Sequence, residues 1–153
     1  MMPPGPSERI WYVVMNTSRA RIIRELPGAR NQAAAEITMQ SARRNLRDIL
    51  HNKPTRSFAS ARDGRRSGVE PGADPLQEDA RAFLREVLGF LDEQYRLHAF
   101  DGLVLIAPSG CVGLWRTELP GTLRECVRQE FQKNLVRLSS GELAAAVRAL
   151  VSG

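Results

Sequence analysis

The chain has 153 residues, of which 22 are Lys or Arg and 17 are Asp or Glu, so its formal net charge is +5 at pH 7. This length suits one domain that buries a core without disulfides or metal. The two cysteines form no paired motif, and no segment reaches the roughly 18 to 20 apolar residues of a transmembrane helix. We therefore expect a cytoplasmic protein with reduced thiols, and neither a secreted disulfide-rich fold nor a membrane span.

The first half of the chain predicts strands followed by a short helix. Residues 1–8 are Pro-rich and are expected to form a flexible N-terminus ahead of a single domain over 9–153. The β-branched and aromatic run 10–15 predicts a buried strand, and alternation over 19–23 predicts its hairpin partner. A third strand is expected over 33–39. Apolar residues at helical spacing from Ser41 then predict a helix that ends near residue 52.

The clearest helix is predicted over 74–95. Asp74 and Gln77 can form a capping box around Pro75 at the first helical position. The apolar stripe that follows consists of Ala80, Phe83, Leu84, Val87, Leu91 and Tyr95. The run 103–107 is apolar throughout, as in a strand covered on both faces. A strand after a long helix implies a crossover, so we predict an α/β fold in which flanking helices cover a mixed β-sheet.

The C-terminal third is expected to be mostly helical. Pro108-Ser109-Gly110 ends the interior strand and opens a helix, which Pro120-Gly121 interrupts. Apolar residues at helical spacing over 123–131 predict a further amphipathic helix, and 135–138 is expected to be a short extended piece. Ser139-Ser140-Gly141-Glu142 has the pattern of a capping box and predicts a terminal helix.

Positive charge is concentrated in the first part of the chain. Residues 1–66 hold 13 basic and 5 acidic side chains, whereas 67–153 hold 9 and 12. The densest stretch lies in a predicted loop over 52–74, which has little apolar content to bury and is expected to be exposed. Its basic residues are Lys53, Arg56, Arg62, Arg65 and Arg66. The natural partner of such a loop is an anion.

Two interpretations of this loop stay open. Its arginines can neutralise several RNA phosphates while Phe58 stacks on a base, which would make RNA or a ribosome-associated surface the partner. Alternatively, the charge run is a solvated face: Arg56 and Glu70 pin the loop to the domain through ion pairs, and Phe58 is a hydrophobic anchor. A protein partner is compatible with either interpretation, and the oligomeric state is left open.

A second candidate anion site is Ser109-Gly110, because a helix N-terminus offers free backbone N–H groups and a positive dipole. The polar residues 16–18 can join it if the first strand lies alongside. The alternative is that Ser109 only caps the helix. Arg19 and Arg21 alternate onto one strand face and can extend the basic surface, although exposed strand arginines need no such role.

Catalytic and cofactor signals are weak. His51 and His98 are the only histidines, and neither has a Cys or carboxylate at metal-ligand spacing. No phosphate-binding glycine loop, dinucleotide fingerprint or nucleophile elbow is present. We expect no catalytic residues, no metal and no cofactor.

Several blocks, in order, resemble the bacterial host attachment protein family, which is related in fold to the middle domain of archaeal and eukaryotic release factors and Pelota. The resemblance spans nearly the whole chain. It is carried by Trp11-Tyr12-Val13-Val14, Ser18-Arg19-Ala20-Arg21-Ile22, Arg56-Ser57-Phe58, the stretch from Arg66 to Asp74-Pro75, Phe100-Asp101-Gly102-Leu103-Val104-Leu105-Ile106-Ala107-Pro108, Gly113-Leu114, Asn134-Leu135, and Leu138 with Glu142-Leu143.

The departures from the family pattern limit what the resemblance implies. Ser67 stands where the central loop of the family usually has His, and Ser109-Gly110-Cys111 replaces a Pro-Arg-Phe sequence after the core strand. The Gly-Gly-Gln tripeptide of release factors is absent, so their peptidyl-tRNA hydrolysis is not implied. The resulting hypothesis is a non-catalytic domain that binds RNA or a ribosome-associated surface through the 52–74 loop. The alternatives are a protein-interaction or regulatory module for attachment to host cells, and a small-anion or nucleotide sensor.

Overall fold

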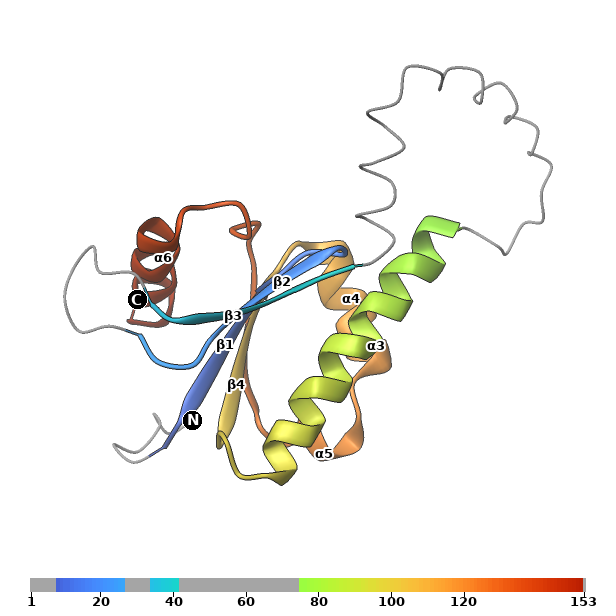
Figure 1. Ribbon diagram of the computed structural model, residues 1–153, viewed down its shortest axis with the longest axis horizontal. Coiled ribbons are helices and arrows are strands. Elements are labelled where there is room, and N and C mark those ends of the chain that lie inside the picture. The colour runs from blue at the N-terminus through green and yellow to red at the C-terminus, as the bar shows by residue number, and fades with distance from the viewer. Residues whose placement is uncertain (1–7, 27–33, 42–74, 153) are drawn as a thin grey trace, which may run out of the picture.

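A five-stranded mixed β-sheet, in the order β3-β2-β1-β4-β5, forms the centre of the computed structural model, which describes residues 8–26, 34–41 and 75–152 (Figure 1). β1 pairs antiparallel with β2 and parallel with β4, β2 pairs antiparallel with β3, and β4 pairs parallel with β5. The strands are β1 (Ile10–Met15), β2 (Arg19–Ile23), β3 (Glu36–Gln40), β4 (Gly102–Ala107) and β5 (Val127–Gln132). The predicted α/β class is confirmed.

The structure confirms the predicted strands β1, β2 and β4. In each of them, the pattern of apolar residues in the sequence matches the burial of the strand. β1 and β2 form the expected hairpin, with Met15 opposite Ala20 and Tyr12 opposite Ile23. β4 is buried at all six positions because it lies between two strands and under helices on both faces. β3 begins and ends later than predicted, at Glu36–Gln40.

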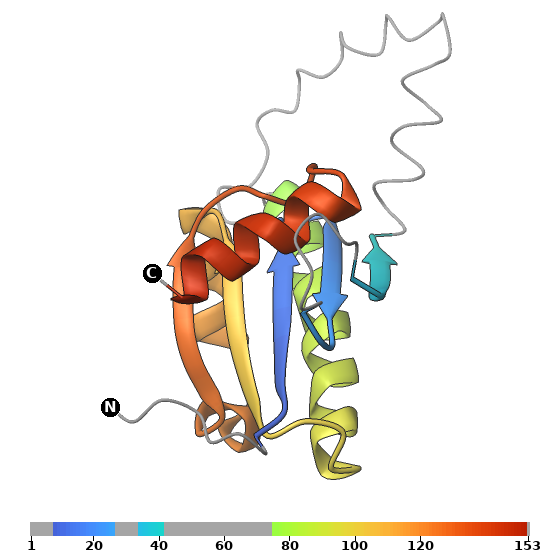
Figure 2. The same ribbon diagram turned by 90° about the vertical axis from the view of Figure 1, so that its left-hand side faces the viewer.

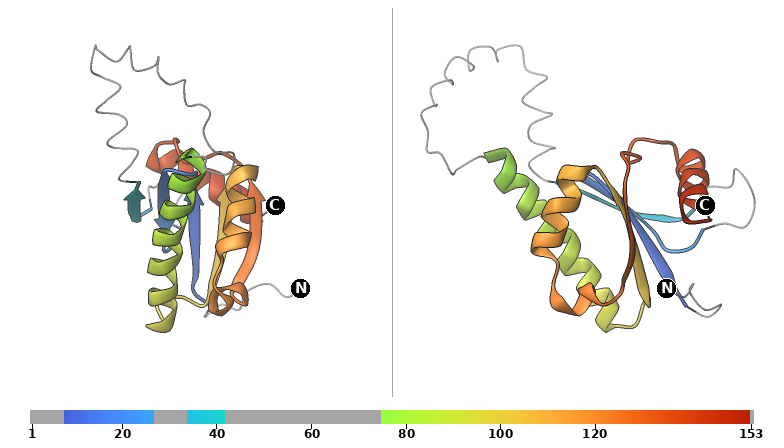
Figure 3. Two further views of the ribbon diagram at one scale, coloured as in Figure 1. Left: turned by 90° about the vertical axis from the view of Figure 1, so that its right-hand side faces the viewer. Right: turned by 180° about the vertical axis from the view of Figure 1, so that it is seen from behind.

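Helices cover both faces of the sheet (Figure 2). α3 (Pro75–Arg96), α4 (Ser109–Glu118) and the short α5 (Gly121–Arg124) lie on one face, and α6 (Ser140–Ser152) lies on the other (Figure 3). The larger core, between the sheet and the first three helices, is built around residues such as Trp11, Phe83 and Trp115. The smaller core packs Val14, Val104 and Ile106 against α6.

α3 matches its predicted apolar stripe. The stripe is buried from Ala80 to Leu91, and Tyr95 packs at the edge of the core. Beyond Arg96, the N–H of Ala99 donates to the carbonyl of Gln94 and that of His98 to Tyr95, both at 2.9 Å. These two bonds form a Schellman motif, whose left-handed position is filled here by His98 with φ of 62°. The predicted cap Asp74 lies outside the described residues, as does the helix expected over 42–52.

The prediction of an amphipathic helix over 123–131 is wrong. α5 ends at Arg124, and the chain continues as the edge strand β5. A β-bulge at Arg128, where Leu103 pairs with Val127 but the next residue of β4 pairs with Gln129, shifts the alternation of β5 by one residue. Val127 therefore joins the larger core and Phe131 the smaller one. Their four-residue spacing looks helical, but it arises from a bulged strand.

The segment before α6 also differs from expectation. Residues 135–138 form a turn, not an extended piece, and the N–H of Leu138 donates to the carbonyl of Leu135 at 3.2 Å. The turn buries Val136 beneath α6. The capping box is confirmed: the backbone N–H of Ser139 donates to Oε1 of Glu142, and the N–H of Glu142 donates to the hydroxyl of Ser139, both at 3.3 Å.

Candidate functional site

The predicted anion-binding residues divide into two groups. Six of them lie outside the described residues: Lys53, Arg56, Phe58, Arg62, Arg65 and Arg66. Their role therefore stays a prediction from the sequence. The other four, Arg19, Arg21, Ser109 and Gly110, belong to β2 and α4.

Several predicted features meet at the carboxyl edge of the sheet. β1, β3 and β4 run in the same direction, so all three end at this edge. The N–H of Ser41, just after β3, donates to the carbonyl of Ser18 in the β1–β2 turn at 2.8 Å. α3 also begins on this side of the molecule, at Pro75 (Figure 2). Ser41 and Pro75, the described residues that flank the arginine-rich stretch in the sequence, therefore both lie on the side of the sheet that holds Ser109.

The β1–β2 turn is organised by Asn16. Its Oδ1 accepts hydrogen bonds from the N–H groups of Ser18 and Arg19, each at 2.9 Å, and its own N–H donates to the carbonyl of Arg19 at 2.9 Å. These bonds close a tight Asx turn between the two strands. Arg19 follows this turn, is half-buried, and pairs with Gln40 at the end of β3.

Ser109 does not cap α4. Pro108 is the N-cap residue, with extended φ and ψ of −63° and 159°, and its carbonyl accepts from the N–H of Val112 at 3.0 Å. Ser109 and Gly110 are the first two helical residues, and both are exposed. A Cβ at Gly110 would meet no atom within 4 Å, so the first turn of α4 is open to a ligand.

Arg21 corrects the expectation of an exposed arginine pair on β2. Its side chain is buried, and Nε and Nη2 donate to Oε1 and Oε2 of Glu36 at 2.8 Å each. Nη1 donates to the carbonyl of Val136 at 2.9 Å and also to that of Leu138. These partners engage all three guanidinium nitrogens and join β2 to β3 and to the turn before α6. Arg21 therefore does not extend the basic surface.

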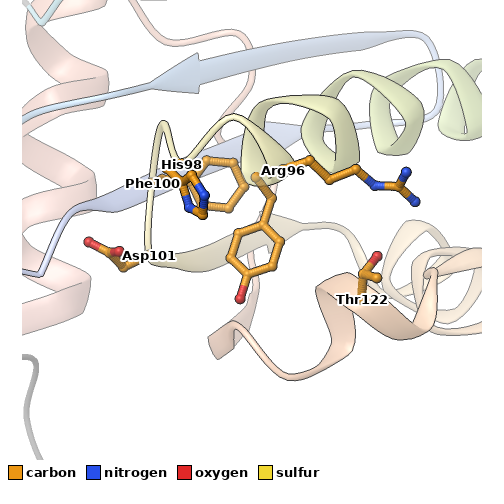
Figure 4. A pocket seen from close by; sticks show the side chains of 6 residues that line it. Arg96, His98, Phe100, Asp101 and Thr122 are labelled. Atoms are coloured by element: carbon orange, nitrogen blue, oxygen red, sulfur yellow. The ribbon is translucent and has the colours of Figure 1, made fainter.

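A shallow depression of about 290 Å³ lies at the opposite, amino edge of the sheet (Figure 4). Tyr95, Arg96, His98, Phe100, Asp101 and Thr122 line it. The backbone N–H of Arg9 donates to Asp101 at 2.8 Å, and this bond, together with the Arg9 side chain, lowers the pKa of the Asp101 carboxyl. In the sequence, His98 has no partner at metal-ligand spacing, and the depression was not predicted. The local sequence does not predict this depression, because Thr122 on its wall belongs to a separate helix, α5.

A larger surface groove, of about 550 Å³, follows β5. Its lining residues come from α4, α5 and β5: Arg116, Leu119, Arg124, Val127, Arg128, Gln129 and Glu130. Sequence reasoning missed this groove because it placed 123–131 in a helix. The available signal was three arginines between residues 116 and 128, spaced eight and then four residues apart.

The two cysteines line neither the depression nor the groove. Cys111 and Cys126 are free and buried, and burial raises the pKa of each thiol from 9.0 to about 11. In the described ranges, no three His, Cys, Asp or Glu side chains are grouped closely enough to hold a metal ion. None of the helices placed by the structure is both long and apolar enough to cross a membrane.

Comparison with known proteins identifies the family of the chain. Among curated proteins, none matches the chain at a significant level of sequence similarity. A family model described as "Protein required for attachment to host cells" matches residues 11–147, a range that includes β1 from its second residue, the other four strands and most of α6. The chain therefore belongs to the family of proteins required for attachment to host cells.

Proposed function

We propose that the protein is an interaction module that supports attachment to host cells by binding an acidic partner protein. The observation that carries this proposal is the family match over residues 11–147. An attachment role requires contact with another molecule, and the predicted charge of the 53–66 segment favours a negatively charged one.

The carboxyl edge of the sheet is the proposed contact surface. Ser41 and Pro75, which flank the arginine-rich segment, both lie on this side, together with the exposed first turn of α4. The segment holds Arg62, Arg65 and Arg66 within five residues. Guanidinium groups form bidentate hydrogen bonds with carboxylates, so this clustering suits an acidic protein surface.

The test combines capture with a matched charge control. Tagged protein is used to capture partners from native lysate treated with nuclease, and the purified partner is then titrated directly. The variant Arg62→Ala, Arg65→Ala, Arg66→Ala is compared with Arg24→Ala, Arg96→Ala, Arg137→Ala, which removes the same charge from exposed described positions. We expect the first variant to weaken partner binding at least tenfold and the control to bind normally.

The same variants test the biological role. A strain that lacks the protein should attach poorly to host cells, and complementation with the control variant should restore attachment while the first variant should not. Normal attachment of the deletion strain would overturn the proposed function. Equal binding and equal complementation by both variants would show that the arginine cluster is not the contact.

RNA or a ribosome-associated surface is the second candidate, favoured by the charge of the predicted 52–74 loop and by the predicted relationship to release factors and Pelota. This candidate predicts co-sedimentation with ribosomes that falls steeply as salt rises and is lost in the Arg62, Arg65, Arg66 variant. Nuclease distinguishes the two candidates, since it releases an RNA-dependent partner and leaves a protein partner bound.

A third candidate is a small-anion or nucleotide sensor at Ser109-Gly110, favoured by the open first turn of α4. Phosphate or nucleotide should then raise the melting temperature, and Gly110→Val should abolish this shift. A Cβ at this exposed position would meet no atom within 4 Å, so we expect the substituted protein to fold. An unchanged melting temperature for the unmodified protein would exclude this candidate.

A further inference from the structure

The groove beside β5 follows the free edge of the sheet. β5 is the last strand in the order β3-β2-β1-β4-β5 and hydrogen bonds with β4 on one side (Figure 3). No other described strand pairs with it. Every second residue of β5 therefore directs its backbone N–H and C=O away from the sheet, where another strand can pair with them.

The lining residues show that the groove runs along this edge strand. Val127, Arg128, Gln129 and Glu130 are consecutive, and all four line the groove. The groove therefore runs along β5 over these four residues, with residues of the α4–α5 side as its other wall. The bulge lies at Arg128, and Gln129 to Gln132 pair in regular register with β4.

The other wall of the groove comes from the helices and is basic. Arg116 lies in the last turn of α4, Leu119 is the C-cap residue of that helix, and Arg124 is the last residue of α5. Leu119 is 6 % exposed and, with Val127, forms the apolar floor. A groove between an edge strand and a helix has the geometry of sites that bind an extended peptide as an additional strand.

The arginines of the groove differ in how they are paired. Nη2 of Arg116 donates to Oε1 of Glu130 at 2.7 Å, although the Arg116 side chain is 62 % exposed. Arg128 pairs with Glu8 at 2.6 Å. Arg124 donates to the carbonyl of Leu119 at 3.0 Å and has no carboxylate within ion-pair distance among the described residues. Arg124 is therefore the cation that an incoming carboxylate can bind without displacing another.

We propose that this groove binds an extended acidic segment of a partner protein, which adds as a strand to β5. Backbone hydrogen bonds along Gln129 to Gln132 provide the affinity, and a carboxylate of the peptide pairs with Arg124. A second carboxylate can share Arg116 with Glu130. The groove is separate from the arginine-rich segment of the proposed function, so either site can be tested without the other.

The test uses a synthetic peptide of nine residues that alternates Glu with Val, carries a fluorophore and is titrated by fluorescence anisotropy. Arg124→Glu should raise its Kd at least tenfold, because charge reversal repels the carboxylate. The matched control Arg137→Glu reverses an exposed arginine in the turn before α6 and should leave the Kd unchanged. A peptide that alternates Lys with Val should not bind to the unmodified protein.

Two N-methylated forms of the peptide test the backbone pairing. One is methylated on its odd residues and the other on its even residues, so one form loses the N–H groups that face β5 and the other keeps them. We expect one form to bind normally and the other at least tenfold more weakly. Equal binding of both forms, or an unchanged Kd for Arg124→Glu, would overturn the proposal. Loss of peptide binding in the Arg62, Arg65, Arg66 variant would also overturn it, by placing the peptide on the arginine-rich segment.

Discussion

Arg21 and Glu36 form a two-point ion pair inside the protein, with both N–O distances at 2.8 Å and side-chain exposures of 4 % and 10 %. The same guanidinium donates to the carbonyls of Val136 and Leu138. One side chain thus connects the β2–β3 pair to the turn that leads into α6. Removal of one member of a buried pair leaves the other charge without a partner, which is more costly than removal of both.

Arg21→Ala should lower the free energy of unfolding by about 3–5 kcal/mol, the range observed when a buried ion pair loses one partner. The double variant Arg21→Leu, Glu36→Leu should lower the free energy of unfolding less than Arg21→Ala does, because it leaves no carboxylate without a partner. Arg24→Ala, at an exposed position next to β2, should stay within about 0.5 kcal/mol of the unmodified protein. Urea denaturation of the three variants measures this, and a loss below about 1 kcal/mol for Arg21→Ala would contradict the prediction.

His98→Gly should stabilise the protein by about 0.5–1 kcal/mol. The φ of 62° at His98 costs a residue with a Cβ about 1–2 kcal/mol, and the greater freedom of Gly in the unfolded chain offsets part of the gain. His98→Val should instead destabilise, because a β-branched side chain tolerates this conformation least. Thermal denaturation of both variants gives the comparison, and equal melting temperatures for Gly and Val would argue against strain at this position.

Ser139→Ala should lower the free energy of unfolding by about 1 kcal/mol through loss of the capping box at α6. The adjacent Ser140→Ala is the matched control, since Ser140 is the exposed first residue of the helix. It should change stability by less than about 0.5 kcal/mol. Similar losses for both variants in chemical denaturation would assign the effect to helix composition, not to the cap.

Cys111 and Cys126 should react slowly with a thiol reagent in the native protein. A pKa of about 11 in place of 9.0 lowers the thiolate fraction near pH 8 about 100-fold. Because folding raises both pKa values, the stabilisation from the neutral thiols is full below about pH 9 and is lost as pH rises towards about 11. Reaction with Ellman's reagent from pH 7 to 11, with and without denaturant, measures this. Rapid native labelling at neutral pH would contradict the raised pKa.

The local sequence was sufficient for elements whose periodicity and burial coincide. β4 is apolar at every position because both of its faces are covered, and α3 carries an uninterrupted apolar stripe. The capping box of Ser139 and Glu142 involves neighbours in the chain, so its pattern predicts its geometry. Within the candidate site, the same reasoning identified Ser109 and Gly110 at the start of a helix, but not the surfaces formed by separate elements.

The sequence alone determined the α/β class, the β1–β2 hairpin, the interior strand β4 and the helices α3, α4 and α6, because neighbouring residues encode these elements. The tertiary structure decided the rest. Arg21 is buried because Glu36 and two carbonyls more than a hundred residues away supply its hydrogen bonds. β5 is a strand because the open edge of β4 pairs with it, and its bulge gives the sequence a helical spacing. Such partners are distant along the chain, so they cannot be predicted from a local sequence pattern.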